Sequence, residues 1–142
     1  MHWIDEIMDD IPQETHPTVL VVDDEPVIRE LVSMLLEDEG YTVRQAADGL
    51  DALQEVEADG IDLVLTDIKM PRLDGASLAR QLCSREHAVP VVLMSAVFPA
   101  AELPDVPFLR KPFAPDHLTH VIAEVLAGNG HEIAMGGTQP SG

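Results

Sequence analysis

In IDLVLTDIKMP, residues 61–71, a short apolar run ends at an acid, Asp67. A carboxylate at the end of a buried strand costs desolvation free energy unless a partner compensates for it. Two other apolar runs end in charged residues: Asp23 and Asp24 follow a run near the N-terminus, and Lys111 follows one near the C-terminus. Three acids and one lysine at the ends of parallel strands suggest a site for a divalent metal and a phosphoryl group.

Apolar runs alternate with segments of helical periodicity along most of the chain, which predicts an α/β fold with a parallel sheet and right-handed crossovers. The expected strands are Thr18–Asp23, Tyr41–Ala46, Ile61–Thr66, Pro90–Ser95 and Phe108–Arg110. The expected helices are 26–39, Leu50–Ala58, Asp74–Glu86 and Pro115–Ala127.

The first helix has the clearest internal pattern. Asp24 is its expected N-cap, and Pro26 suits the first helical position. Its expected apolar stripe consists of Val27, Leu31, Met34 and Leu35. Elsewhere, we expect Thr66 and Cys83 to be core residues.

Ligands of an open parallel sheet bind beyond the carboxyl ends of the strands, where the winding direction switches. The residues expected at those ends are Asp23, Asp24, Asp67, Ser95 and Lys111. Polar residues that are far apart in the sequence would therefore converge on one pocket, which is stronger support for a site than any one of them alone.

The charge of the chain restricts its partners. Its formal net charge is −18, from 26 Asp+Glu against 8 Lys+Arg. Such a surface repels nucleic acid and anionic lipid, so we expect neither direct nucleic-acid binding nor membrane binding. No apolar run approaches the length of about 20 residues that a membrane span needs. The single cysteine, Cys83, fits a reducing compartment, and we expect a cytoplasmic protein.

We expect one domain at residues 18–127, preceded by an acidic extension at 1–17 and followed by a flexible Gly-rich tail at 128–142. Ile4, Ile7, Met8 and Ile11 have helical spacing within the extension. The extension is therefore either a frayed acidic leader or a short amphipathic helix that docks on the domain or on a second copy.

Five short pieces occur in order at the expected strand and helix ends: VVDDEP (21–26), DIKMP (67–71), DG (74–75), SA (95–96) and KPF (111–113). Each piece is weak alone, but together they are specific. With them the chain resembles, from about Thr18 to Leu126, the receiver domain of bacterial two-component response regulators. The resemblance implies a doubly wound, five-stranded parallel sheet with the flavodoxin-like strand order 2-1-3-4-5.

The resemblance also implies roles for the acids. Asp67 would be the phosphoacceptor, which attacks a phosphohistidine to form an acyl phosphate. Asp23 and Asp24 would bind Mg²⁺ together with Asp67, and the backbone carbonyl of Lys69 would complete the metal site. The metal would offset the repulsion between the carboxylates and the incoming phosphoryl group.

The remaining residues of the implied site surround the phosphoryl group. Lys111 would pair with its oxygens as a compact cation, and Ser95 would donate a hydroxyl hydrogen bond to them. Phe108 matches the aromatic switch residue of the family, although a plain core phenylalanine is an open alternative. The peptide bond between Lys111 and Pro112 is a candidate cis bond.

The chain departs from the family between Ser95 and Phe108, where only 12 residues remain and three of them are prolines. A parallel crossover needs about a dozen residues and usually includes a helix, and proline in a helix interior costs about 3 kcal/mol. We therefore expect the fourth helix of the family to be a single turn around Ala100–Leu103, or to be missing. The surface through which the family commonly signals would then be remodelled.

The leading hypothesis is a signalling receiver, not an enzyme, that takes a phosphoryl group from a histidine kinase or phosphotransfer protein. It would act by contact with an unidentified downstream protein, as a monomer or weak homodimer. A stand-alone receiver is the simpler interpretation, and a piece of a longer protein is the other. The competing hypotheses are a Mg²⁺-dependent aspartyl phosphatase or phosphotransferase, and a module that is never phosphorylated. The enzymes usually have a second acid two residues after the nucleophile, where this chain has Lys69.

Overall fold

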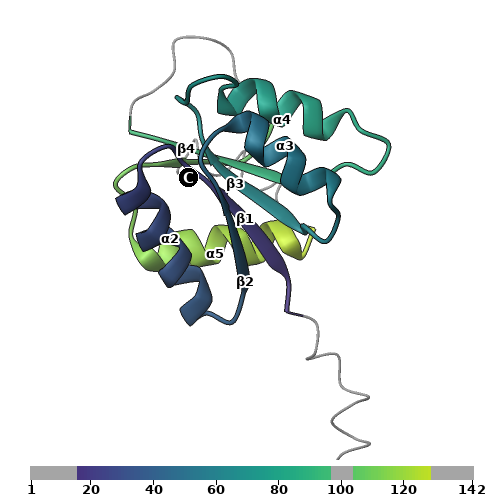
Figure 1. The fold of residues 1–142 in the computed structure, drawn as a ribbon. Helices are drawn as coiled ribbons and strands as arrows, with labels where there is room; N and C mark the ends of the chain where they lie inside the picture. Colours follow the sequence, from purple (N-terminus) through teal and green to yellow (C-terminus); the bar gives the residue numbers. More distant parts are fainter. Residues whose placement is uncertain (1–15, 97–103, 129–142) are drawn as a thin grey trace, which may run out of the picture.

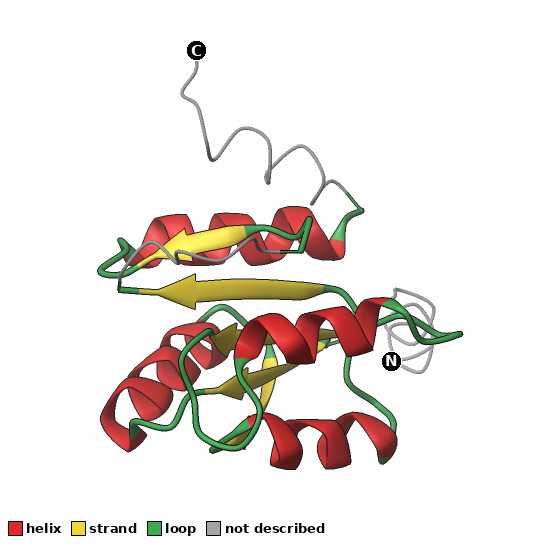
Figure 2. Ribbon diagram, turned by 90° about the horizontal axis from the view of Figure 1, so that it is seen from above, coloured by secondary structure: helices red, strands yellow, loops and turns green. Residues whose placement is uncertain are grey.

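The fold is built around a parallel sheet of five strands. The structure, a computed structural model, describes residues 16–96 and 104–128. The strands lie in the order β2-β1-β3-β4-β5, and every neighbouring pair is parallel. Figure 2 shows their arrowheads pointing to the same side of the molecule. This confirms the predicted fold and strand order. The strands are β1 (Thr18–Val22), β2 (Thr42–Ala46), β3 (Leu63–Asp67), β4 (Val91–Ser95) and β5 (Phe108–Arg110).

Helices cover both faces of the sheet (Figure 1). They are α2 (Pro26–Asp38), α3 (Gly49–Glu57), α4 (Gly75–Cys83) and α5 (Pro115–Leu126). Successive residues of a strand point to opposite faces, so Val19 and Val21 of β1 pack on the side of α2 and α5, while Leu20 and Val22 pack on the side of α3 and α4. Both faces of the central strands are thus buried, as the near-continuous apolar runs predict.

The fourth helix of the family is expected to be shortened or missing in the connection from β4 to β5. Residues 104–107, the described part of this connection before β5, are not helical. The expected single turn around 100–103 lies outside the described residues.

The predicted apolar stripe of α2 is wrong for three of its four members. Val27, Leu31 and Met34 are 77%, 52% and 53% exposed. The core side of α2 is formed instead by Val32 and Leu36, which are buried. Because one residue turns a helix by about 100°, α2 has two neighbouring apolar stripes, and only the second one faces the sheet. Periodicity alone does not distinguish them.

Two further expectations about local structure are corrected. The N-cap of α2 is Glu25 and not Asp24, so the helix begins directly at Pro26, and the Asp23 carboxylate accepts the N–H of Glu25 at 2.9 Å. Cys83 is exposed at the end of α4 and is not a core residue. It follows Leu82, whose side chain faces the core, so it points about 100° away from the sheet.

Thr66 is fully buried, as expected, and its hydroxyl donates to the Asp67 carbonyl at 2.9 Å. Phe108 is partly buried against the core on the side of α3 and α4. Within residues 16–96 and 104–128, the helices are all too short or too polar to cross a membrane.

Candidate functional site

The carboxyl ends of four strands bring the predicted site residues together. Asp67 and Ser95 are the last residues of β3 and β4, while Asp23 and Lys111 directly follow β1 and β5. The pairing register keeps these ends level, since Asp67 lies beside Met94 and the Lys111 N–H donates to the Ser95 carbonyl at 2.8 Å. The convergence expected from parallel strands is therefore present in the structure.

Three carboxylates form the centre of the site. Asp23, Asp24 and Asp67 each offer an oxygen atom, and these oxygens all lie within 4.8 Å of one another. Asp23 is fully buried, Asp24 is exposed, and Asp67 lies between these extremes. Clustered carboxylate oxygens with an open, wet side fit Mg²⁺, which takes hard oxygen ligands and keeps several of its waters.

Lys111 is the cation nearest to these acids. Its Nζ lies 3.0 Å from Asp23 Oδ2 and 3.6 Å from Asp67 Oδ1. The lysine side chain is only 17% exposed, so its charge acts on the two carboxylates with little solvent screening. The bond from Lys111 to Pro112 is cis, as expected.

The environment of Asp67 shifts its proton equilibrium. Burial raises the pKa of this carboxyl from 3.8 to about 6, against the opposing effect of Lys111, and the neighbouring Asp23 and Asp24 raise it further. Burial and like charges both disfavour the ionised form. A cation placed among the three acids would therefore displace a proton from Asp67 or repel it from binding there.

A cavity of about 320 Å³ opens over Asp24 and Asp67, with the buried Asp23 beside them. Residues from several strand ends line it, including Lys69, Ser95 and Lys111. Ser95 is 5% exposed and lines this cavity. Phe108 does not line the cavity, and its packing is that of a core residue, so its role as a switch stays a prediction.

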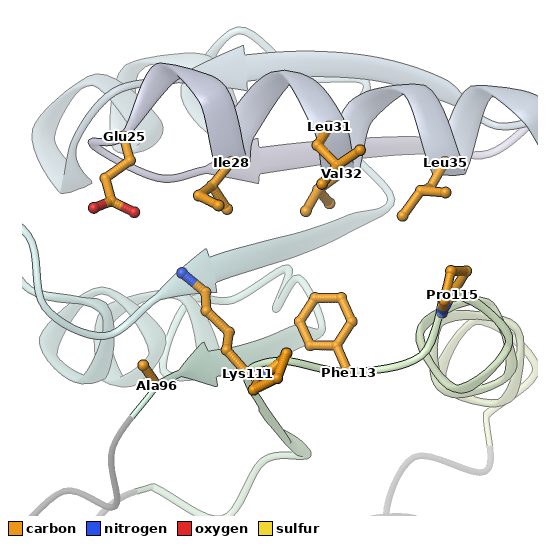
Figure 3. Close-up of a pocket in the computed structure, with 10 residues that line it drawn as sticks. Glu25, Ile28, Leu31, Val32, Leu35, Ala96, Lys111, Phe113 and Pro115 are labelled. Carbon is orange, nitrogen blue, oxygen red and sulfur yellow. The ribbon is translucent and has the colours of Figure 1, made fainter.

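A second, larger hollow of about 510 Å³ lies beside the first, between α2 and the start of α5 (Figure 3). Its walls are largely apolar. Ile28 and Leu35 of α2 face Phe113 across it, and Lys111 borders both cavities. Among the residues that the structure describes, its lining contains no cluster of acids. The candidate site for a metal ion and a phosphoryl group is therefore the smaller cavity.

The loop after β3 approaches Asp67 so closely that only glycine fits at its far end. A Cβ on Gly75 would stand 2.1 Å from the Asp67 carbonyl oxygen. Asp74 precedes it and caps α4 by accepting the N–H of Ser77 at 2.7 Å. The DG pair thus returns the chain to the end of β3 and starts the next helix there.

Sequence reasoning missed an arginine that supports the site from outside. Arg29 Nη1 donates to the Asp23 carbonyl at 2.7 Å, and Nε donates to Gln45 Oε1 at 3.0 Å. Position 29 lies one turn into α2, so its long side chain reaches back over the loop that carries the acids. The bond goes to a backbone atom, which no residue pattern signals.

Comparison with known proteins places this geometry in a family. The family described as "Response regulator receiver domain" matches residues 19–123. The chain belongs to this family. The match confirms the predicted relationship and, with it, a phosphorylation-dependent signalling receiver.

Similar proteins show how this receiver relates to longer chains. It is 38% identical over 135 residues to the transcriptional regulatory protein CseB of Streptomyces coelicolor, covering 91% of this chain and 56% of that protein. It is 40% identical over 79 residues to the probable transcriptional regulatory protein TcrX of Mycobacterium tuberculosis, covering 56% of this chain and 34% of that protein. The receiver therefore spans about half or less of these curated relatives.

Solved structures agree with the fold of this receiver. The chemotaxis response regulator CheY4 of Vibrio cholerae matches with a TM-score of 0.69 and 28% identity, over 78% of this chain and 99% of that one. The response regulator TrrA of Thermotoga maritima matches with a TM-score of 0.69 and 31% identity, over 77% and 98% of the two chains. TrrA was solved in complex with Mg²⁺ and BeF.

Proposed function

We propose that this receiver accepts a phosphoryl group on Asp67 from a histidine kinase or phosphotransfer protein. The observation that carries the proposal is the cluster of Asp23, Asp24 and Asp67 with Lys111 beside it. A carboxylate oxygen of Asp67 attacks the phosphorus of a phosphohistidine. The new O–P bond forms as the P–N bond breaks, and the imidazole leaves and takes up a proton.

The other groups of the cavity serve this transfer. Asp23, Asp24, Asp67 and the Lys69 carbonyl would hold Mg²⁺, which would offset the charge of the phosphoryl oxygens. Lys111 pairs with the same oxygens, and the Ser95 hydroxyl donates a hydrogen bond to them. The TrrA complex with Mg²⁺ and BeF supports the choice of cation.

Residues 18–127 form the receiver in this proposal, flanked by the acidic extension 1–17 and the Gly-rich tail 128–142. The family match over 19–123 supports these bounds. The receiver acts in the cytoplasm by contact with a downstream protein, as a monomer or weak homodimer, and is not a turnover enzyme. The net charge of −18 disfavours direct binding to nucleic acid or to an anionic membrane.

The test is incubation with Mg²⁺ and acetyl phosphate, followed by intact-mass measurement, with beryllofluoride binding as a second readout. We expect one phosphoryl group per chain, which Asp67→Asn removes. Asp59→Asn is the matched control, because Asp59 is an exposed acid in a turn with φ 77°, a conformation that asparagine tolerates. It should be labelled like the wild type.

Two other outcomes would redirect the proposal. Sustained release of many phosphates per chain would favour the aspartyl phosphatase, although Lys69 stands where such enzymes usually have their second acid. Failure of the wild type to form any adduct, with donor that labels another receiver in the same buffer, would contradict phosphorylation at Asp67.

A further inference from the structure

Arg72 has a backbone conformation that side chains other than glycine rarely adopt. Its φ is +71°, in the left-handed region, and it lies in the loop between β3 and α4. Left-handed backbone costs a non-glycine residue about 1–2 kcal/mol. Strain of this kind persists where the surrounding structure holds the residue, and it often marks a functional site.

The side chain of Arg72 explains what holds it. Its Nε donates to Asp48 Oδ2 at 2.9 Å and its Nη2 donates to Asp48 Oδ1 at 3.0 Å. Nη2 also donates to Asp51 Oδ1 at 3.1 Å. A guanidinium that meets both oxygens of one carboxylate makes the stronger, more directional kind of ion pair. Arg72 therefore fastens the β3–α4 loop to the first turn of α3.

Asp48 is a fixed anchor for this contact. It is 8% exposed, and it caps α3 by accepting the N–H of Asp51 at 2.9 Å. That backbone hydrogen bond and the Arg72 guanidinium hold the pKa of Asp48 below its usual range, despite its burial. The carboxylate is therefore charged at neutral pH and cannot swing away without uncapping the helix.

Backbone packing reinforces the same contact. A Cβ on Gly49 would stand 2.3 Å from the Leu73 carbonyl oxygen, so the loop presses directly on the start of α3. At its other end, the loop is closed by the Gly75 N–H, which donates to the Ile68 carbonyl at 2.8 Å. Lys69 lies in the sequence between Ile68, which accepts that hydrogen bond, and Arg72, which binds the start of α3. Lys69 also lines the cavity over the acids.

We propose that Arg72 is a positioning residue for the cation site, because it fixes the loop that presents the Lys69 carbonyl. The inference rests on the proposed function, which supplies the cation. Arg72 itself contacts neither the cation nor the phosphoryl group. It acts through Asp48, outside the cavity, much as outer residues around metal sites orient the ligands themselves.

The expected changes in stability and in Mg²⁺ affinity distinguish a positioning role from a purely structural one. The Arg72 side chain is 51% exposed, and exposed ion pairs contribute about 0–1 kcal/mol to stability. Its removal also relieves the strain of the left-handed backbone if glycine replaces it. We therefore expect Arg72→Gly to change the unfolding temperature little, whereas loss of an outer positioning contact weakens metal affinity roughly 10-fold.

The experiment titrates metal-free protein with Mg²⁺ by calorimetry and records thermal unfolding of the same samples. Arg72→Gly should raise the Mg²⁺ Kd roughly 10-fold with nearly unchanged unfolding. Arg85→Ala is the matched control, because Arg85 Nη1 pairs with Glu57 of α3 at 3.0 Å, beyond the last turn of α4. Its Mg²⁺ Kd should equal that of the wild type.

A double variant tests the route through Asp48. Asp48→Asn keeps one oxygen to cap α3 but removes the second oxygen that Arg72 uses. In the Asp48→Asn background, Arg72→Gly should raise the Mg²⁺ Kd by a smaller factor than in the wild type, because Arg72 there keeps only its hydrogen bonds to Oδ1 of residue 48 and to Asp51. If Arg72→Gly binds Mg²⁺ with the wild-type Kd, the positioning role is wrong. It is also wrong if Arg72→Gly weakens binding as much in the Asp48→Asn background as in the wild type. Neither result would contradict the proposed function. A wild type that binds no Mg²⁺ overturns the proposed function and this inference with it.

Discussion

The two loops that supply the acids are held in different ways. The β1–α2 loop is short, and its buried acid is the centre of its contacts: the Asp23 carboxylate accepts the Glu25 N–H at 2.9 Å and Lys111 Nζ at 3.0 Å, and Arg29 donates to the Asp23 carbonyl. The β3–α4 loop is longer, and its tip depends on a neighbouring helix through Arg72. A short loop can be ordered by hydrogen bonds to its own acid, while a longer loop needs contacts outside the site.

The largest expected effect tests the base of the longer loop. Gly75→Ala puts a Cβ 2.1 Å from the Asp67 carbonyl oxygen, so the backbone must move at the proposed phosphoacceptor. We expect a loss of about 3 kcal/mol or more in the free energy of unfolding, at or above the usual cost of overpacking. Urea denaturation measures it.

Gly40→Ala is the matched control for this change. Gly40 has φ +98° but no neighbour within 4 Å of an added Cβ. Only the backbone strain of about 1–2 kcal/mol should appear there. Equal losses in the two variants would contradict the tight contact between Gly75 and Asp67.

The next effect tests how far the β1–α2 loop depends on Lys111, a lysine that is distant in the sequence. Lys111→Met leaves the buried Asp23 carboxylate without its ion-pair partner, which typically costs about 3–5 kcal/mol for a fully buried pair. Because Lys111 is 17% exposed, we expect the lower end, about 3 kcal/mol, in urea denaturation without metal. Added Mg²⁺ should restore part of the loss. Lys69→Met, at an exposed lysine, should change stability by less than about 0.5 kcal/mol.

The smallest effect has the opposite sign and depends on pH. The pKa of Asp67 is raised from 3.8 to about 6 in the folded protein. The folded state therefore prefers the protonated carboxyl, and its stability falls as the pH rises from about 4 through about 6. Asp67→Asn removes this cost, so metal-free protein should gain up to about 3 kcal/mol at pH 7 and nothing near pH 3.5.

Parallel measurements on Asp23→Asn sharpen the comparison between the loops. Asp23 is fully buried, and Lys111 pairs with it more closely than with Asp67. Its substitution by asparagine should therefore lower stability at pH 7, where Asp67→Asn raises it. Urea denaturation at pH 7 compares the two variants, and the same sign in both would mean that the two acids sit in equivalent environments.

The sequence predicts the sheet well because its signals are local and redundant. All five strands lie within two residues of their expected limits, since each is a short apolar run between turns. The site follows from topology, because parallel strands end at one edge of a sheet. No motif is needed to bring Asp23 and Lys111, 88 residues apart, within 3.0 Å.

Packing choices and backbone contacts are what the sequence does not disclose. α2 has two apolar stripes, and the sheet buries Val32 and Leu36 and leaves Val27 exposed. The support from Arg29 goes to a carbonyl oxygen. Arg72 adopts a conformation in which glycine is the ordinary residue, so its role becomes visible only once its partner Asp48 is seen.

The contact between Lys111 and Asp23 has a consequence for folding. It joins the ends of β1 and β5, and Asp67 lies midway between the two residues in sequence. Contacts between such distant residues form only after long loops have closed, so they belong to the slow, late part of assembly. A molecule in which β5 is unfolded still has Asp67, the proposed phosphoacceptor, but Lys111 is not held beside it. If Asp67 accepts a phosphoryl group only with Lys111 in place, phosphoryl uptake measures the fraction of molecules in which all five strands of the sheet are formed.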